Sequence, residues 1–276
     1  MGKHERGWAE PAEINVSDGL NGITQDKHIT QVVDTIKREI GSDYSHAKWV
    51  GGGSYGDPGD VHVYWANEKI ERIELKFSRS DGEGTIKNPG AAVFTKEISD
   101  TIKSYREWDT ELGLKDKRWK LVESVINKPL KTQREYGNTL RSFKQTHPEI
   151  INEVVNITAY GQTSYAQYAA RELNNHIPRV NSLVTKILGI KESPSELDKH
   201  LRYCVVKNFE TDKQTVEFLN FTDIDKTVTS VVPEGKSITF LNASGAVVVR
   251  FSVHWKNVCQ GGLSPCFNVF AGTAHK

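Results

Sequence analysis

The sequence predicts an α+β fold: a helix and a β-hairpin near the N-terminus, a helical middle and a β-rich C-terminal part. Two observations support this expectation. Apolar residues recur at helical spacing early in the chain and in its middle, whereas hydrophobic and polar residues alternate in residues 60–77 and in much of 202–276. We expect one domain over residues 1–276, with a core at about 25–110, a helical middle at 111–201 and a β-rich part at 202–276.

The first predicted element is a helix over residues 25–40. Its apolar residues fall on one stripe, and Gly41 ends the helix. The stripe consists of Ile29, Val32, Val33, Ile36 and Ile40. The next segment, residues 51–59, contains five glycines, so we expect it to be a loop.

A β-hairpin is predicted from residues 60–65 and 70–77, joined by residues 66–69. Successive side chains of a strand point to opposite faces, so one face of this hairpin is apolar and the other carries its charges. The apolar face consists of Val61, Val63, Trp65, Ile73, Leu75 and Phe77.

The later elements are predicted from the same two patterns, helical spacing of apolar residues and alternation of apolar and polar residues. A polar loop over residues 78–87 leads to a helix that begins at Asn88-Pro89 and buries Phe94, Ile98, Ile102 and Tyr105. Further helices are expected over 148–160, 162–174, 177–188 and 193–200. Strands are expected over 202–209, 215–221, 227–232, 237–241 and 246–255.

Composition excludes several classes of protein. No run of 18 apolar residues is present, so we expect no membrane span. The charged N-terminal segment lacks the apolar stretch of a secretory signal. Three cysteines are too few and odd in number for a disulfide framework. We therefore expect a cytoplasmic protein with reduced thiols.

The net charge of +1 is unevenly distributed. Residues 115–144 contain nine Lys or Arg and three Asp or Glu, a local charge of +6, together with Trp119 and Tyr136. Such a segment suits contact with a polyanion backbone, and it equally suits a solvated helical face. The sequence leaves both interpretations open.

The polar face of the hairpin carries a candidate site. If the turn centres on Glu68, Asp60 faces Lys76, and Asp60 and Glu74 are diagonal neighbours. Two carboxylates at one end of a hairpin suit a hard cation such as Mg²⁺, and a nearby ammonium can act on a metal-bound water. The alternative is an ordinary exposed sheet face with cross-strand ion pairs.

The arrangement resembles the motif of the PD-(D/E)xK nucleases. Asp60 is followed after thirteen residues by Glu74-Leu75-Lys76, and Gly59 stands where the family often has Pro. The resemblance covers residues 25–105 and implies a restriction-endonuclease-like mixed sheet flanked by helices. Type II restriction endonucleases are the largest set of this size in that family.

The resemblance assigns roles to these residues. Asp60, Glu74 and the Leu75 carbonyl would bind Mg²⁺, and Lys76 would activate the attacking water, leaving 5′-phosphate and 3′-hydroxyl ends. Glu39 is the candidate for the accessory Glu that many members carry on the preceding helix. A type II enzyme further implies double-stranded DNA as substrate, a homodimer, a cognate DNA methyltransferase, and a bacterial or phage cell interior.

Loops on either side of the hairpin end are the expected places for DNA contact. The candidate DNA-binding residues are Ser54, Tyr55, Ser78, Arg79 and Lys87. Two alternatives remain beside restriction: a general repair or phage nuclease of the same fold, and a non-catalytic DNA-binding protein in which the hairpin charges are incidental.

Overall fold

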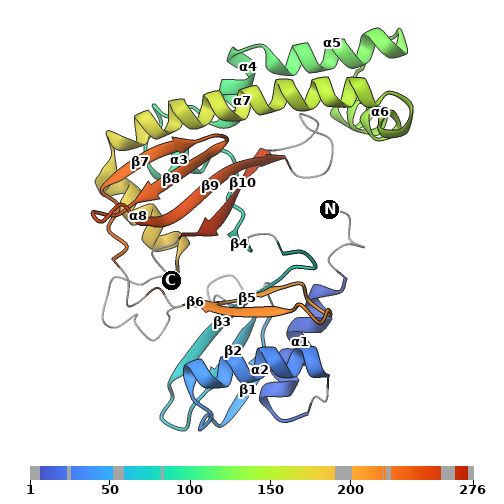
Figure 1. Cartoon of the computed structure of the whole chain (residues 1–276). Helices are drawn as coiled ribbons and strands as arrows, with labels where there is room; N and C mark the ends of the chain where they lie inside the picture. The colour runs from blue at the N-terminus through green and yellow to red at the C-terminus, as the bar shows by residue number, and fades with distance from the viewer. Residues whose placement is uncertain are drawn as a thin grey trace. The chain divides into compact units, whose positions relative to one another are not determined.

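The computed structural model describes residues 7–23, 26–51, 59–81, 84–189, 201–219, 221, 225–255 and 265–272. Within these residues the protein has two five-stranded sheets with accompanying helices (Figure 1), which confirms the α+β class. The chain divides into two compact units. The first contains the described residues up to Ile86 and those between Val184 and Lys226, and the second contains the rest.

The sheet of the first unit has the strand order β1-β2-β3-β5-β6. Its strands are β1 (His46–Trp49), β2 (Val61–Tyr64), β3 (Ile70–Phe77), β5 (Leu201–Lys207) and β6 (Thr215–Leu219). Neighbouring strands are antiparallel except β3 and β5, which are parallel. The sheet is therefore mixed, and two strands from the segment expected to be β-rich complete it beside the hairpin.

The predicted hairpin is confirmed, but its register is not the expected one. Val61 pairs with Ile73, and the Trp65 amide donates to the Lys69 carbonyl at 2.9 Å, so the loop is three residues long. Its last residue, Glu68, has φ 65°, as in a hairpin loop closed by a bulge. The turn therefore centres on Asn67 rather than Glu68, which shifts every cross-strand pair by two residues and leaves both faces unchanged.

The predicted helix over residues 25–40 is confirmed as α2 (Lys27–Ile40). Asp26 caps it by accepting from the His28 and Ile29 amides at 2.8 and 3.0 Å. Gly41, with φ 93°, ends it.

An earlier helix, α1 (Ala9–Leu20), was not predicted. Its buried residues Ala12, Val16 and Leu20 recur at four-residue spacing, but Pro11 and Gly19 interrupt the pattern. Proline is tolerated here because the first turn of a helix has no intrahelical acceptor for its amide.

α1 and α2 contribute to one hydrophobic core with the apolar face of the sheet. From the helices the core takes Ala12, Val16, Leu20, Ile29, Val32, Val33 and Ile36, and from the strands Val61, Val63, Ile73, Leu75, Cys204 and Val206. Burial raises the pKa of the Cys204 thiol to about 12, and Cys204 forms no disulfide. The thiol is consequently protonated and acts as an apolar core residue.

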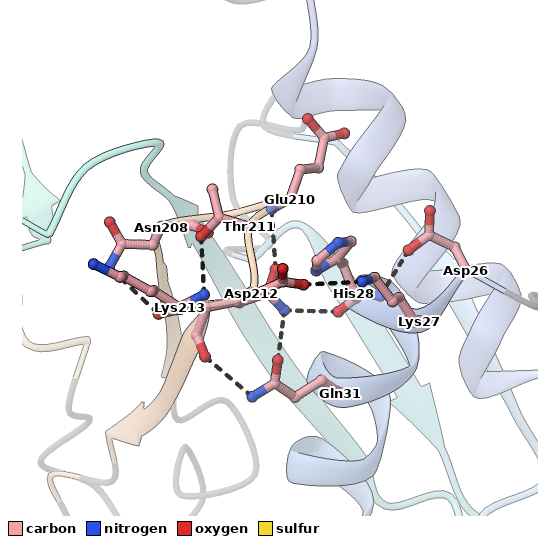
Figure 2. A network of polar contacts seen from close by, with 10 residues as sticks. Asp26, Lys27, His28, Gln31, Asn208, Glu210, Thr211, Asp212 and Lys213 are labelled. Carbon is pink, nitrogen blue, oxygen red and sulfur yellow. Dashed lines mark hydrogen bonds and ion pairs between the residues drawn. The ribbon is translucent and has the colours of Figure 1, made fainter.

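The loop between β5 and β6 is bonded to the start of α2 (Figure 2). Gln214 is buried and donates from Nε2 to the His28 carbonyl at 2.8 Å and to Gln31 Oε1 at 3.0 Å. On the solvent side, Lys27 Nζ lies 3.1 Å from Asp212 Oδ1. These bonds hold the β6 edge of the sheet against α2.

The second unit has helices beside an antiparallel sheet of order β4-β10-β9-β8-β7. Its strands are β4 (Thr85–Lys87), which leads in from the first unit, β7 (Ser230–Glu234), β8 (Ser237–Leu241), β9 (Val247–Trp255) and β10 (Pro265–Ala271). Its helices are α3 (Val93–Glu97), α4 (Tyr105–Glu111), α5 (Leu114–Ile126), α6 (Gln133–Thr146), α7 (Pro148–Asn174) and α8 (Ile177–Ile187), the last leading back to the first unit. The long helix α7 crosses the sheet and contacts β7 and β8 (Figure 1).

Three predictions for residues 78–105 are corrected. The expected loop over residues 78–87 ends in strand β4. The helix expected at Asn88-Pro89 begins only at Val93, because the Pro89 carbonyl accepts from the Phe267 amide at 2.8 Å and keeps this segment beside the sheet. Phe94, Ile98, Ile102 and Tyr105 are all buried as expected, but they are divided between α3, α4 and the segment that joins them.

A fourth correction concerns the helices expected over 148–160 and 162–174, which are one helix, α7. Gly161 lies inside this helix rather than ending it, and a Cβ there would lie 2.6 Å from Leu114 Cδ1, so the glycine allows close packing against Leu114. The helix expected over 193–200 lies outside the described residues. In the part of the chain that is described, no helix has the length and hydrophobicity needed to cross a bilayer.

Candidate active site beside the first hairpin

Asp60 is held at the entry to β2 by two hydrogen bonds to β3. Its amide donates to the Ile73 carbonyl, and its Oδ2 accepts from the Leu75 amide, both at 2.8 Å. These two partners flank Glu74 in the chain, so Asp60 lies beside Glu74. The side chain is 7% exposed, and the carboxylate takes the place of a strand carbonyl at the end of the ladder.

Gly59 explains why the residue before Asp60 is not proline. Its φ of 108° lies outside the range that a proline ring permits. A Cβ at this position would lie 3.3 Å from both the amide nitrogen and the carbonyl oxygen of Ile73. The chain therefore approaches β3 closely just before the carboxylate, and this approach requires glycine.

Glu74 and Lys76 lie on the same face of β3 and form an ion pair between Glu74 Oε1 and Lys76 Nζ. Their side chains are 15% and 28% exposed, so the pair is shielded but still reached by solvent. Because β3 is paired on both sides, by β2 and by β5, its backbone is fixed. The predicted residues Asp60, Glu74 and Lys76 thus lie together: Glu74 and Lys76 on the inner strand β3, and Asp60 beside Glu74 at the entry to β2.

Tyr203 on β5 flanks this stretch, since it pairs with Glu74 in the parallel ladder. Burial, with a smaller contribution from the charge of Glu74, raises the pKa of Tyr203 well above its ordinary value. Its hydroxyl donates to the Ile187 carbonyl at 3.1 Å. The β5 side of the site is therefore lined by a neutral, anchored ring.

Glu13 on α1 is a further carboxylate at the site that sequence reasoning missed. Burial, followed by the negative charge of Asp60, raises its pKa to about 7, while Lys76 and a bond from Trp49 act in the opposite direction. The Trp49 indole Nε1 donates to Glu13 Oε2 at 3.3 Å. Glu13 directly follows Ala12, which belongs to the buried stripe of α1. A prediction of that helix would therefore have placed Glu13 next to its buried side.

The predicted accessory residue Glu39, unlike Glu13, is exposed to solvent. It lies near the end of α2, with its Oε1 3.7 Å from Arg38 Nε. The charged groups that act on Glu13 include Asp60, Glu74 and Lys76, so the N-terminal helix that supplies a carboxylate to this region is α1.

Possible metal ligands are few. In the described ranges, no group of three or more His, Cys, Asp or Glu side chains has the geometry of a metal site. The oxygen donors that the sequence analysis proposed are two carboxylates, of Asp60 and Glu74, and the Leu75 carbonyl. Oxygen ligands of this kind, supplemented by water, suit Mg²⁺ better than Zn²⁺, which favours nitrogen and sulfur.

The candidate DNA-binding residues are dispersed. Ser54 and Tyr55 lie outside the described residues. Arg79 is exposed, but its Nη2 lies 3.1 Å from Glu210 Oε2 and its guanidinium covers the Trp8 ring at 4.5 Å. The Ser78 hydroxyl bonds to Ser80, and Lys87 closes β4 in the second unit.

Comparison with known proteins provides no relative. No protein-family model matches the chain, and neither a curated protein nor a solved structure matches it.

Proposed function

We propose that the protein is a Mg²⁺-dependent endodeoxyribonuclease with a restriction-endonuclease-like fold. One observation carries the proposal: Asp60 is bonded through its amide and its carboxylate to the residues on either side of Glu74, within two residues of Lys76. A mixed sheet with helices, whose inner strand bears the Glu-x-Lys segment, agrees with the fold that the resemblance implies.

The residues fit the implied cation. Asp60 and Glu74 supply carboxylate oxygens from two adjacent strands, and the Leu75 carbonyl is a third oxygen ligand. Bound Mg²⁺ polarises a phosphate and lowers the pKa of a coordinated water. Glu13, whose pKa is about 7, adds negative charge from α1 when it is ionised, and that charge favours retention of a cation.

Lys76 is the group that acts on the attacking water. Without a cation its ammonium is paired with Glu74. If that carboxylate bound a cation instead, the ammonium would be free to orient the attacking water and to donate to the phosphate oxygen on which charge develops, and the proton of the water would pass to solvent. Hydrolysis that breaks the bond between phosphorus and the 3′ oxygen leaves a 5′-phosphate and a 3′-hydroxyl.

We assign site specificity to the second unit, which has its own sheet and helices and is not needed to build the carboxylate site. On this assignment the protein is a type II restriction enzyme. A homodimer is the simplest way to cut both strands of a symmetric site, and a cognate methyltransferase would protect the host DNA.

Incubation of plasmid DNA with the protein in Mg²⁺ and in EDTA tests the proposal. Discrete fragments that require Mg²⁺ support restriction, and a smear supports a general nuclease of the same fold. No cleavage in Mg²⁺ contradicts the enzyme and favours the binding protein.

Lys76→Ala should abolish cutting while DNA binding in Ca²⁺ persists. Lys236→Ala, a change of the same kind at an exposed β7–β8 turn, is the matched control. Cutting by Lys76→Ala at the rate of the control would contradict the role given to Lys76.

A further inference from the structure

The helices α5 and α6 form a platform with its own core. Their apolar residues pack together with the start of α7. The core consists of Val122, Leu130, Tyr136, Leu140, Phe143 and Val154. Trp119 on α5 and Tyr136 on α6 stack with their ring centroids 5.2 Å apart, so the two helices contact each other at this point. One side of the pair is thus apolar and buried, and the other faces solvent.

The solvent side is strongly basic. Of the nine basic residues in 115–144, Arg118 is fully buried and bonds to both carboxylate oxygens of Asp109, at 3.0 and 2.6 Å. Lys115 is half-buried, with its ammonium 5.3 Å from the Trp119 ring. The other seven are exposed: Lys117, Lys120, Lys128, Lys131, Arg134, Arg141 and Lys144.

The nearby carboxylates are largely committed to the backbone. Glu123 accepts from the Leu130 amide at 2.7 Å. Glu135 closes the capping box of α6 by accepting from the Lys131 and Thr132 amides. Among the described residues, no carboxylate lies within 4.0 Å of the seven exposed cations.

Some exposed cations of the first unit do have acidic partners. Lys27 is paired with Asp212 and Arg79 with Glu210. The α5–α6 platform instead has an excess of positive charge. The charges of Lys128 and Lys131 act on Glu135, but among the described residues none of the seven cations forms an ion pair, and such an excess of like charge is unfavourable for the protein alone. A polyanionic partner removes that disadvantage.

Polar side chains on the exposed side of α6 are spaced so that they can follow the phosphate backbone of a nucleic acid. Arg134, Asn138, Arg141 and Gln145 recur at intervals of four, three and four residues and so form one stripe. Arg141 Nη1 donates to Asn138 Oδ1 at 2.7 Å, as expected of neighbours on this stripe. At 1.5 Å per residue the stripe is about 16 Å long, which matches about five base pairs of duplex.

We infer that the exposed faces of α5 and α6 bind the phosphate backbone of double-stranded DNA, with Arg134 and Arg141 at the centre of the contact. Guanidinium and amide groups are the usual donors to phosphate oxygens. The inference deepens the proposed function, because it names where the substrate is held, apart from the carboxylate site. A phosphate contact gives affinity and position without sequence preference.

The test is binding of a fluorescent DNA duplex in EDTA over a series of salt concentrations. The variant Lys120→Gln/Arg134→Gln/Arg141→Gln should bind about tenfold or more weakly at low salt, and the slope of log affinity against log salt should fall by about 2.7. The control Lys48→Gln/Lys96→Gln/Lys236→Gln removes the same charge from exposed positions elsewhere and should leave the slope unchanged. Thermal melting followed by circular dichroism verifies that both variants are folded.

Equal slopes for the two variants, or an unchanged slope in the α5–α6 variant, would overturn the inference. Displacement of the duplex by poly-glutamate at equal charge concentration would overturn the choice of DNA over an acidic protein, and preference for an RNA duplex would overturn the choice of DNA over RNA. The outcome is separable from that of the proposed function: a wild type that binds through α5–α6 but never cuts in Mg²⁺ contradicts only the nuclease.

Discussion

The two sheets of this protein bury different kinds of side chain. In the first, Asp60, Glu71 and Arg72 are each less than a tenth exposed. In the second, no Asp, Glu, Lys or Arg among the described residues of β7 to β10 is buried, and Phe240, Phe251 and Phe267 fill the core. Burial of a charged side chain is unfavourable unless that group has hydrogen-bond or ion-pair partners. A sheet that buries several charged side chains is therefore expected to carry a functional site. The second sheet is built for packing.

The largest effect on stability is expected in the second sheet. Phe251 lies between Phe94, Phe240 and Phe267, with ring centroids 5.3, 5.0 and 5.7 Å away. Phe251→Ala should lower the free energy of unfolding by about 3–5 kcal/mol, because it leaves a cavity in this cluster. Urea unfolding measures the change, with Val232→Ala on the exposed side of β7 as control. A loss no greater than that of the control would argue against a packed aromatic core.

Asp60→Asn should separate catalysis from stability in the first sheet. Cleavage should fall by about a thousandfold, because the ligand charge is lost. The fold should change little, because an amide oxygen can still accept from Leu75. Plasmid cleavage and urea unfolding measure the two effects, and Asp34→Asn on the exposed side of α2 is the control. Cleavage within tenfold of wild type would show that Asp60 is only a structural cap.

A smaller effect is expected at the edge of the same sheet. Gln214→Ala should lower the free energy of unfolding by about 1–3 kcal/mol, since it removes bonds to His28 and Gln31 from a buried position. Lys27→Ala in the same network should have no measurable effect, because both members of its ion pair are exposed. Urea unfolding distinguishes them, and equal losses would mean that burial does not decide the strength of this network.

The smallest expected effect is a pH dependence in the absence of divalent cations. Glu13 has a folded pKa of about 7 against an ordinary value of 4.5, so the folded state binds more protons than the unfolded state between these values. Stability should therefore fall as pH rises through this window, and Glu13→Gln should flatten the decline. Unfolding measured at both ends of the window tests this, and a decline of equal size in the variant would place its origin elsewhere.

Short-range patterns predicted the local elements of the first unit well. The alternation in β2 and β3 and the stripe of α2 are strong signals, and both elements formed where expected. The register failed because a positive φ at Glu68 shortened the loop, which no hydrophobic pattern reveals. The shift placed Asp60 beside Glu74 instead of opposite Lys76.

Contacts between segments far apart in the chain could not be predicted from local sequence patterns. The parallel pairing of β3 with β5 joins segments separated by most of the second unit, and residues 88–92 follow the sheet because Pro89 bonds to Phe267. Glu13 was missed for a related reason: α1 has a weak pattern of its own and is stabilised by packing on the sheet. Its carboxylate acquires its environment only through that packing.

The parallel pairing of β3 with β5 also constrains the order of folding. During synthesis the residues of β3 emerge long before Leu201 does, so the strand that carries Glu74 and Lys76 has an open edge while the intervening helices are made. An unpaired inner strand is prone to association with other chains. Nascent chains arrested before β5 should therefore aggregate through this edge, and the candidate active site can be completed only late in translation.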